Sequence, residues 1–225
     1  MNEPDRGHVD PGGPPLVRAL TQRGRRVTVT KQSVGPMDNN AYLLVDEAEG
    51  EGLLIDAADE ATRLLDLVGD TRLAAIVTTH RHFDHVQALA AVAEHTGARA
   101  LAHPADAPAI PVVDAEIDDG EEVAFGGARV TVRHTPGHTP GSVCLLLDGD
   151  GAAGEPGRYL FTGDTLFPGG PGKTTTPETF AQIMDSLEQR LFSLPDDTHV
   201  CPGHGDDTTL GHERPHLDEW RSRGW

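Results

Sequence analysis

The chain has 225 residues, of which 37% are hydrophobic and 24% are charged, a composition typical of a globular protein rather than a disordered one. Its formal net charge of −18 and its lack of lysine- or arginine-rich runs argue against nucleic-acid binding. No apolar run is long enough to cross a membrane and the first residues do not resemble a signal peptide, so we expect a cytoplasmic protein without a membrane partner. Cys144 and Cys201 are expected to be buried thiols.

The first half of the chain alternates strand-like runs with helical patterns. The segment 1–26 begins with many prolines and glycines, and we expect it to be flexible. Apolar runs between turn residues predict strands over 26–32, 41–46, 52–57 and 73–77. Apolar residues at helical spacing predict amphipathic helices over 59–69 and again from Val86 onward. The last of these strands ends at a cluster of histidines.

The second half continues with more strands and two helices. Strands are predicted over 99–102, 121–125, 128–135, 142–148, 158–164 and 198–202, with a short broken helix or a turn over 103–110. Thr176 and Pro177 are a favourable N-cap and first position for a helix that extends to Leu191, and a last helix is expected over 210–222. This order indicates one α/β domain over 27–225, with two sheets between outer helices.

The sequence THRHFDH (79–85) places four potential metal ligands in six positions: His80, His82, Asp84 and His85. In an extended loop, residues i and i+2 point the same way, so His80 and His82 can bind one cation. Asp84 and His85 lie where the chain turns into a helix and are offset enough to reach a second cation. The alternative, a helix N-cap at Asp84 among solvated histidines, explains Asp84 alone.

Three further ligand-type residues follow predicted strands beside glycines. His138 lies in TPGHTPGS (135–142), Asp164 in LFTGDTLF (160–167) and His204 in CPGHG (201–205). A single histidine or aspartate in a turn is usually only a turn residue. Three of them, each at the end of a strand, indicate the other half of a metal site.

Together these motifs resemble the metallo-β-lactamase superfamily, and within it the glyoxalase II-like hydrolases, over residues 27–219. The resemblance implies a four-layered αββα sandwich. It implies one metal bound by His80, His82 and His138, a second bound by Asp84, His85 and His204, and Asp164 bridging both. The expected cofactors are two divalent ions, in the first place zinc, with iron or manganese as alternatives.

Two neighbouring divalent ions can activate water at neutral pH and stabilise a developing oxyanion. Asp84 is therefore also a candidate catalytic residue that orients this water or takes its proton. Hydrolysis of a small-molecule thioester or a related activated ester follows as the leading hypothesis, because a thiolate leaves without needing an acid. β-Lactamase activity is disfavoured, since the lactamases of this superfamily lack an aspartate that matches Asp164.

Two alternatives remain open. Persulfide dioxygenases are similar but use one iron, held by residues matching His80, His138 and Asp164 in the manner of two-histidine, one-carboxylate sites. A non-enzymatic scaffold is the other alternative, although no ligand position is substituted.

The resemblance also implies a substrate contact at Lys173, because glyoxalase II has a lysine there that binds the glutathione moiety. The aromatic residue that follows in glyoxalase II is Thr175 here. The chain also ends soon after His204, so we expect the helical C-terminal domain that supplies other glutathione contacts to be missing. Lys173 could equally be an ordinary loop lysine, and the thiol carrier remains open.

Overall fold

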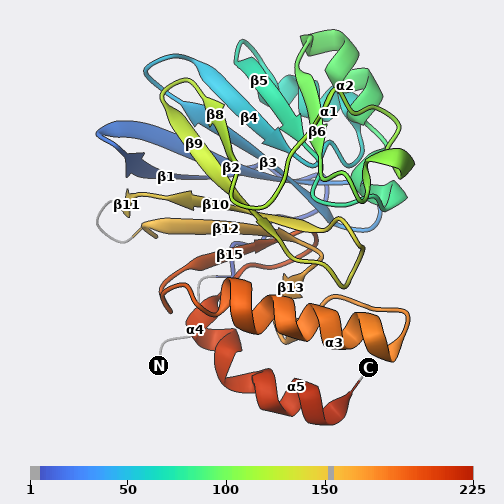
Figure 1. The fold of residues 1–225 in the computed structure, drawn as a ribbon. Helices are drawn as coiled ribbons and strands as arrows, with labels where there is room; N and C mark the ends of the chain where they lie inside the picture. Colours follow the sequence, from blue (N-terminus) through green and yellow to red (C-terminus); the bar gives the residue numbers. More distant parts are fainter. Residues whose placement is uncertain (1–5, 152–154, 225) are drawn as a thin grey trace.

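The computed structural model describes residues 6–151 and 155–224. Two β-sheets pack face to face, and helices cover the outer face of each (Figure 1). Helices α1 (Ala61–Val68) and α2 (Leu89–Thr96) lie over the first sheet, and α3 (Pro177–Ser186) lies over the second. This arrangement is the four-layered αββα sandwich that the sequence predicts.

The first sheet joins an antiparallel half to a parallel half. Its strands, in spatial order, are β11 (Asp150–Gly151), β1 (Leu16–Gln22), β2 (Arg25–Val34), β3 (Asn39–Asp46), β4 (Glu51–Ile55), β5 (Arg72–Val77), β6 (Arg99–Ala102) and β7 (Ala115–Glu116). Strands β4 to β7 run parallel. Their carboxyl ends therefore share one edge, and the histidine cluster directly follows β5 at this edge.

The second sheet places three more loops at one of its edges. Its strands, in spatial order, are β16 (Thr208–Thr209), β15 (His199–Pro202), β12 (Arg158–Gly163), β10 (Val143–Asp148), β9 (Ala128–His134) and β8 (Glu122–Phe125). Because β15 runs parallel to β12, and β9 pairs antiparallel to β10, the loops after β9, β12 and β15 emerge together. A small hairpin of β13 (Leu166–Phe167) and β14 (Gly170–Pro171) follows β12.

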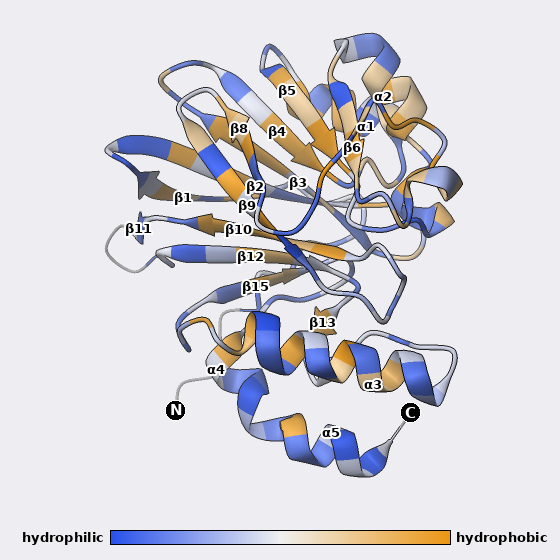
Figure 2. Ribbon diagram, in the orientation of Figure 1, coloured by the Kyte–Doolittle hydropathy of each residue, from blue (hydrophilic) through white to orange (hydrophobic). Residues whose placement is uncertain are grey.

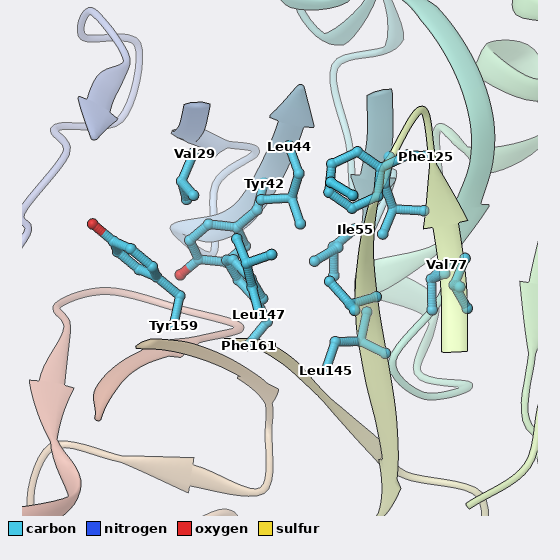
Figure 3. Packing of buried hydrophobic residues seen from close by; sticks show 14 of the residues in the cluster. Val29, Tyr42, Leu44, Ile55, Val77, Phe125, Leu145, Leu147, Tyr159 and Phe161 are labelled. Atoms are coloured by element: carbon cyan, nitrogen blue, oxygen red, sulfur yellow. The ribbon is translucent and has the colours of Figure 1, made fainter. Parts of the chain in front are cut away.

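Apolar side chains fill three interfaces between the four layers. Between the sheets, Tyr42 from β3 packs its ring against Phe161 from β12, with centroids 5.0 Å apart (Figure 3). A second cluster lies under α1 and α2, and a third lies under α3 and the C-terminal helices. Apolar and polar segments alternate along α3, as expected of a helix that covers a sheet (Figure 2).

The helices of the second half match the sequence prediction in position, with two differences. The helix predicted to reach Leu191 is α-helical only to Ser186 and continues as a π-helical turn over Leu187–Leu191, and the last helix is interrupted. Thr176 caps α3 by accepting a hydrogen bond from the Thr179 backbone N–H at 3.2 Å, and Pro177 opens the helix. The last helix is divided into α4 (Leu210–Glu213), a single turn at Arg214–His216 and α5 (Leu217–Arg223). Pro215 in that turn has no N–H to donate. No helix in the described ranges has the length and apolar character of a membrane span.

The N-terminal segment differs from the sequence prediction. Residues 1–5 lie outside the described residues, but Leu16–Gln22 forms strand β1 where we expected a flexible segment up to residue 26. This strand pairs with β2 along its whole length and buries Leu20 in the core between the sheets. The prediction was wrong there because the proline- and glycine-rich start masked a short alternating run.

Candidate metal centre

Loops at one edge of the two sheets bring together all seven residues that the sequence predicts as metal ligands. Four come from the loop after β5, and one each comes from the loops after β9, β12 and β15: His80, His82, Asp84, His85, His138, Asp164 and His204. Asp84 and His85 lie in a single helical turn, Phe83–His85. Within three overlapping groups, the ligand atoms lie within 4.8 Å of one another.

The first group consists of His80, His82 and His138. Nδ1 of His82 lies 2.9 Å from Nε2 of His138, across two loops that are 56 positions apart in sequence. The His80 ring is buried and faces both other rings edge-on, with centroids 4.8 Å from each. The three imidazoles thus converge on one point.

The second group consists of Asp84, His85 and His204. Nε2 of His85 lies 3.1 Å from Nε2 of His204. Oδ2 of Asp84 lies 3.2 Å from Nε2 of His204 and 3.5 Å from Nε2 of His85. Two ring nitrogens and one carboxylate oxygen therefore face one another.

Asp164 lies between the two groups. Its Oδ2 is 3.5 Å from Nε2 of His138 in the first group and 3.5 Å from Nε2 of His204 in the second. Its Oδ1 is 3.4 Å from Nε2 of His85. A Cβ on the neighbouring Gly163 would lie 2.5 Å from the Thr79 hydroxyl, so glycine is needed for this approach. One carboxylate thus reaches both groups.

These residues fit divalent ions. Nε2 of His80 and Oδ1 of Asp164 are buried and accept or donate no hydrogen bond within the described chain, which is costly unless a ligand such as an ion satisfies them. Two nitrogen ligands about 2.1 Å from a tetrahedral ion lie roughly 3.4 Å apart, close to the separations seen here. Imidazole and carboxylate are ligand types that suit zinc and iron.

Four of the five proposed histidine ligands form a hydrogen bond through Nδ1, the ring nitrogen opposite the one that faces the other ligands. The partners are Thr79 Oγ1 for His80 (3.0 Å), Asp56 Oδ2 for His85 (2.9 Å), the Lys173 carbonyl for His138 (2.7 Å) and the Met37 carbonyl for His204 (2.9 Å). In addition, Asn39 donates to Asp84 Oδ2 at 3.0 Å. Such contacts fix the ring orientation and the tautomer of metal ligands.

Several of these supporting residues were missed by the sequence analysis. Asp56 accepts from the Thr79 backbone N–H (2.7 Å) and hydroxyl (2.8 Å) as well as from His85. It directly follows strand β4, so its place at the end of a predicted strand was a signal that could have identified it. Asn39 and Thr79 carry no comparable signal, because isolated Asn and Thr residues are common in turns.

The loop that carries His204 is fixed by buried polar groups on β2 and β3. The Pro202 carbonyl accepts from the Tyr42 hydroxyl at 2.7 Å, and the Gly205 carbonyl accepts from Lys31 Nζ at 2.6 Å. Lys31 also forms a buried ion pair with Asp207 at 2.7 Å. Both cysteines are buried and free, as the sequence predicts.

The electrostatics of the metal-free chain favour a negative Asp164 and a positive His85. Burial, together with the nearby His85, holds the pKa of His80 well below its usual value. Burial also opposes charge on His85, but the carboxylates of Asp164 and Asp56 outweigh it and raise the pKa of His85 to about 10. For Asp164, the close approach of His204 and His85 outweighs burial and holds its pKa well below the usual range.

Metal binding is expected to release protons at pH 8. His85 is protonated there in the metal-free chain, because its pKa is about 10, and a metal ligand must be deprotonated. We expect release of about one proton per chain or more, and roughly tenfold weaker affinity per unit decrease in pH. Calorimetry in two buffers of different ionisation enthalpy measures the release.

The raised pKa of His85 also makes the stability of the metal-free protein depend on pH, but stability falls as the pH rises, whereas metal affinity increases. The stabilisation from protonated His85 is complete below its unfolded pKa of about 6.5 and is lost as the pH rises through about 10.

Zero proton release at pH 8, or a metal affinity independent of pH, would contradict this assignment of charge. A His85→Asn variant should release fewer protons.

The side chain of Lys173 lies outside the three groups. It is exposed, while its carbonyl accepts from His138. Pro171, Gly172, Lys173 and Thr174 line a cavity of about 410 Å³ together with Phe180, Arg223 and Gly224. A Cβ on Gly172 would lie 3.3 Å from Nδ1 of His138, so this cavity borders the first group.

Comparison with known proteins agrees with this geometry. Residues 34–204 match the model of the metallo-beta-lactamase superfamily. A hydroxyacylglutathione hydrolase of Fuscovulum blasticum is 38% identical over 168 residues, which are 74% of this chain and 62% of that protein. The chain thus spans less than two thirds of the length of this relative.

Three solved structures are similar over most of the chain. The BLEG-1 B3 metallo-beta-lactamase is 26% identical with a TM-score of 0.71, covering 84% of this chain and 97% of that one. ETHE1 from Myxococcus xanthus is 31% identical with a TM-score of 0.70, covering 90% and 83%. TTHA1623 in a di-iron-bound form is 35% identical with a TM-score of 0.66, covering 82% and 96%. With its αββα fold and its clusters of metal-binding residues, the chain belongs to the metallo-β-lactamase superfamily.

Proposed function

We propose that the protein is a metal-dependent hydrolase that cleaves a small-molecule thioester or a related activated ester at a centre of two divalent ions. The observation that carries this proposal is the position of Asp164, whose carboxylate reaches both groups of ligand atoms. The similarity to a hydroxyacylglutathione hydrolase supports a thioester as the substrate class.

In this proposal the two groups hold one ion each, with zinc as the first choice and iron or manganese as alternatives. The ligands are His80, His82 and His138 for one ion, Asp84, His85 and His204 for the other, and Asp164 for both. When bound, such ions polarise a carbonyl and lower the pKa of water.

Asp84 is proposed to have a second role, in proton transfer. Asn39 holds its carboxylate by donating to Oδ2 at 3.0 Å and to the Asp84 carbonyl at 3.1 Å. The carboxylate therefore has a fixed orientation from which it can align the attacking water and accept its proton. A thiolate leaving group needs no proton from the protein, which matches a site built from imidazoles and carboxylates.

The surroundings of the centre suggest the shape of the substrate. Phe83 and Met37 are two large apolar side chains that remain exposed, at 67% and 45% of their surface. Phe83 lies between two proposed ligands in the chain, and the Met37 carbonyl holds His204. We propose that they contact the apolar part of the acyl group.

The cavity beside the first group is proposed to bind an anionic end of the substrate. Lys173 and Arg223 both line it, and no acidic residue does. Neither forms an ion pair or a side-chain hydrogen bond with another residue in the described ranges, whereas nearby Arg221 pairs with Asp185 and Glu188. Two free cations in one cavity of a strongly acidic chain favour a carboxylate ligand.

Arg223→Gln and Lys173→Gln are each expected to raise KM about tenfold for an acidic thioester, the loss expected for one charge-assisted hydrogen bond. The acetyl thioester of 3-mercaptopropionate is the test substrate, and that of 3-mercaptopropanamide is its neutral match. The neutral substrate should keep its KM, and Arg221→Gln should leave both unchanged. If the two thioesters had equal KM values in all variants, the proposed contact with the anionic end of the substrate would be wrong.

The function itself is tested by metal analysis of the native protein followed by a thioester panel. Two divalent ions per chain and metal-dependent thioester hydrolysis support the proposal. The structural similarity to ETHE1 makes the persulfide dioxygenase alternative specific enough to test in parallel. One iron per chain, with oxygen uptake on glutathione persulfide and no hydrolysis, would replace the proposal by that alternative.

A further inference from the structure

A buried aspartate outside the ligand set connects the two loops that carry the first group. Asp106 lies between β6 and the single helical turn Ala107–Ala109, and only 1% of its surface is exposed. Within the described residues, its carboxylate forms no hydrogen bond with any of the seven proposed ligand side chains. Its contacts are with the backbone and side chains of the residues beside those ligands.

The Asp106 carboxylate accepts three hydrogen bonds from two loops. Oδ2 accepts from the Arg81 backbone N–H at 3.1 Å and from the Thr139 hydroxyl at 2.5 Å, and Oδ1 accepts from the Gly141 backbone N–H at 3.0 Å. Arg81 is the residue between His80 and His82, and Thr139 directly follows His138. One carboxylate therefore sets the spacing between the loops of the first group.

The neighbouring residues pack closely against this carboxylate. A Cβ on Gly141 would lie 2.7 Å from Cγ of Asp106 and 2.6 Å from its backbone nitrogen, so a larger residue could not let the loops approach. The Arg81 guanidinium Nε lies 3.8 Å from Oδ1 and offsets part of the buried charge. The hydroxyl of Thr139 also contacts that of Ser142 at 2.7 Å, which closes the loop after His138.

The second group has a different buried carboxylate behind it. Asp56 contacts His85 directly and reaches His80 only through the Thr79 hydroxyl. Removing Asp56 is therefore expected to affect the second group first, whereas removing Asp106 acts on the loops of the first group.

We infer that Asp106 is a positioning residue for the group His80, His82 and His138, and that the affinity of this group for its metal ion depends on it. The inference rests on the proposed metal centre but not on the identity of the substrate. Groups that hydrogen-bond directly to metal ligands typically contribute about 10–100-fold to metal affinity, and for Asp106, which acts through the neighbouring residues, we expect the lower end of that range. Because Asp106 does not touch the second group, the loss should be confined to one ion.

The test is Asp106→Asn, which keeps the size of the side chain but replaces one acceptor oxygen with a donor. Metal-free protein is titrated with Zn²⁺ against a chromophoric chelator, and the affinity of each ion is measured. We expect one ion to bind about tenfold more weakly and the other to stay within about twofold. His82→Ala should weaken the same ion, and His204→Ala should weaken the other.

Two further variants separate positioning from a general loss of folding. Thr139→Val removes one of the three hydrogen bonds and should weaken the same ion to a smaller extent. Asp66→Asn, at an exposed position on α1, should leave both affinities unchanged. Thermal unfolding of the metal-free Asp106→Asn protein should stay within a few degrees of the wild type.

The outcomes distinguish this inference from the proposed function. If the wild type binds a single ion, the two-ion proposal fails, while selective weakening of that ion by Asp106→Asn still supports the positioning role through His80 and His138. Unchanged affinity in a folded Asp106→Asn protein would overturn the inference. Equal weakening of two ions would overturn it as well.

Discussion

Asp164→Asn is expected to reduce kcat by about three orders of magnitude, corresponding to about 4 kcal/mol of lost transition-state stabilisation. The asparagine has one carbonyl oxygen and no charge, so it cannot bind two cations at once. Its amide would also face ring nitrogens that now lie 3.4–3.5 Å from the carboxylate oxygens. The measurement is the steady-state turnover of an active thioester, together with the metal content of the same sample.

The metal content of this variant shows whether the loss of turnover is accompanied by the loss of an ion. We expect the average metal content to fall below two ions per chain, because the Asp164 carboxylate reaches both groups. Asp150→Asn, on the exposed strand β11, is the matched control and should retain full activity. Wild-type turnover with a full metal content in Asp164→Asn would contradict the bridging role.

Lys31→Met is expected to lower the free energy of unfolding by about 3–5 kcal/mol. Lys31 and Asp207 are both almost completely buried, with 3% and 2% of their side chains exposed. Removing the ammonium leaves the carboxylate without its cation, and it also removes the donor to the Gly205 carbonyl beside His204. Urea unfolding of the metal-free protein measures the loss.

Two controls test whether the buried charge causes this loss. Lys31→Met combined with Asp207→Asn should recover part of the stability, because the amide carries no charge and can still contact His199 at the present 2.9 Å position. Arg26→Met breaks the exposed pair with Glu47 and should cost less than about 1 kcal/mol. A Lys31→Met loss no larger than that of Arg26→Met would show that the pair is dispensable.

The sequence identifies the seven proposed ligands that the structure brings together, because residues of metal-binding type leave a local pattern. Four of the seven residues fall within six positions, and the others follow strands whose apolar runs are easily recognised. The supporting residues leave no such pattern. Asp106 becomes informative only when the loops at Arg81 and Gly141, far away in sequence, meet around it.

The parts of the fold that sequence reasoning missed are short or atypical. Strands β7, β11, β13, β14 and β16 have two residues each, too few for any periodicity. Strand β1 alternates only briefly after a proline-rich start, and its strand character depends on pairing with β2. Lys31 sits in the middle of β2, where a lysine is normally expected to face solvent.

Each group of proposed ligands draws residues from both sheets. His80 and His82 follow a strand of the first sheet and His138 a strand of the second; His85 and His204 are divided in the same way. A bound ion would therefore link the two sheets, and its binding free energy would add to the stability of the folded chain. In the proposed function, activity and resistance to unfolding would therefore depend on the same few side chains, and a mutation that weakens metal binding would also weaken the packing between the two sheets.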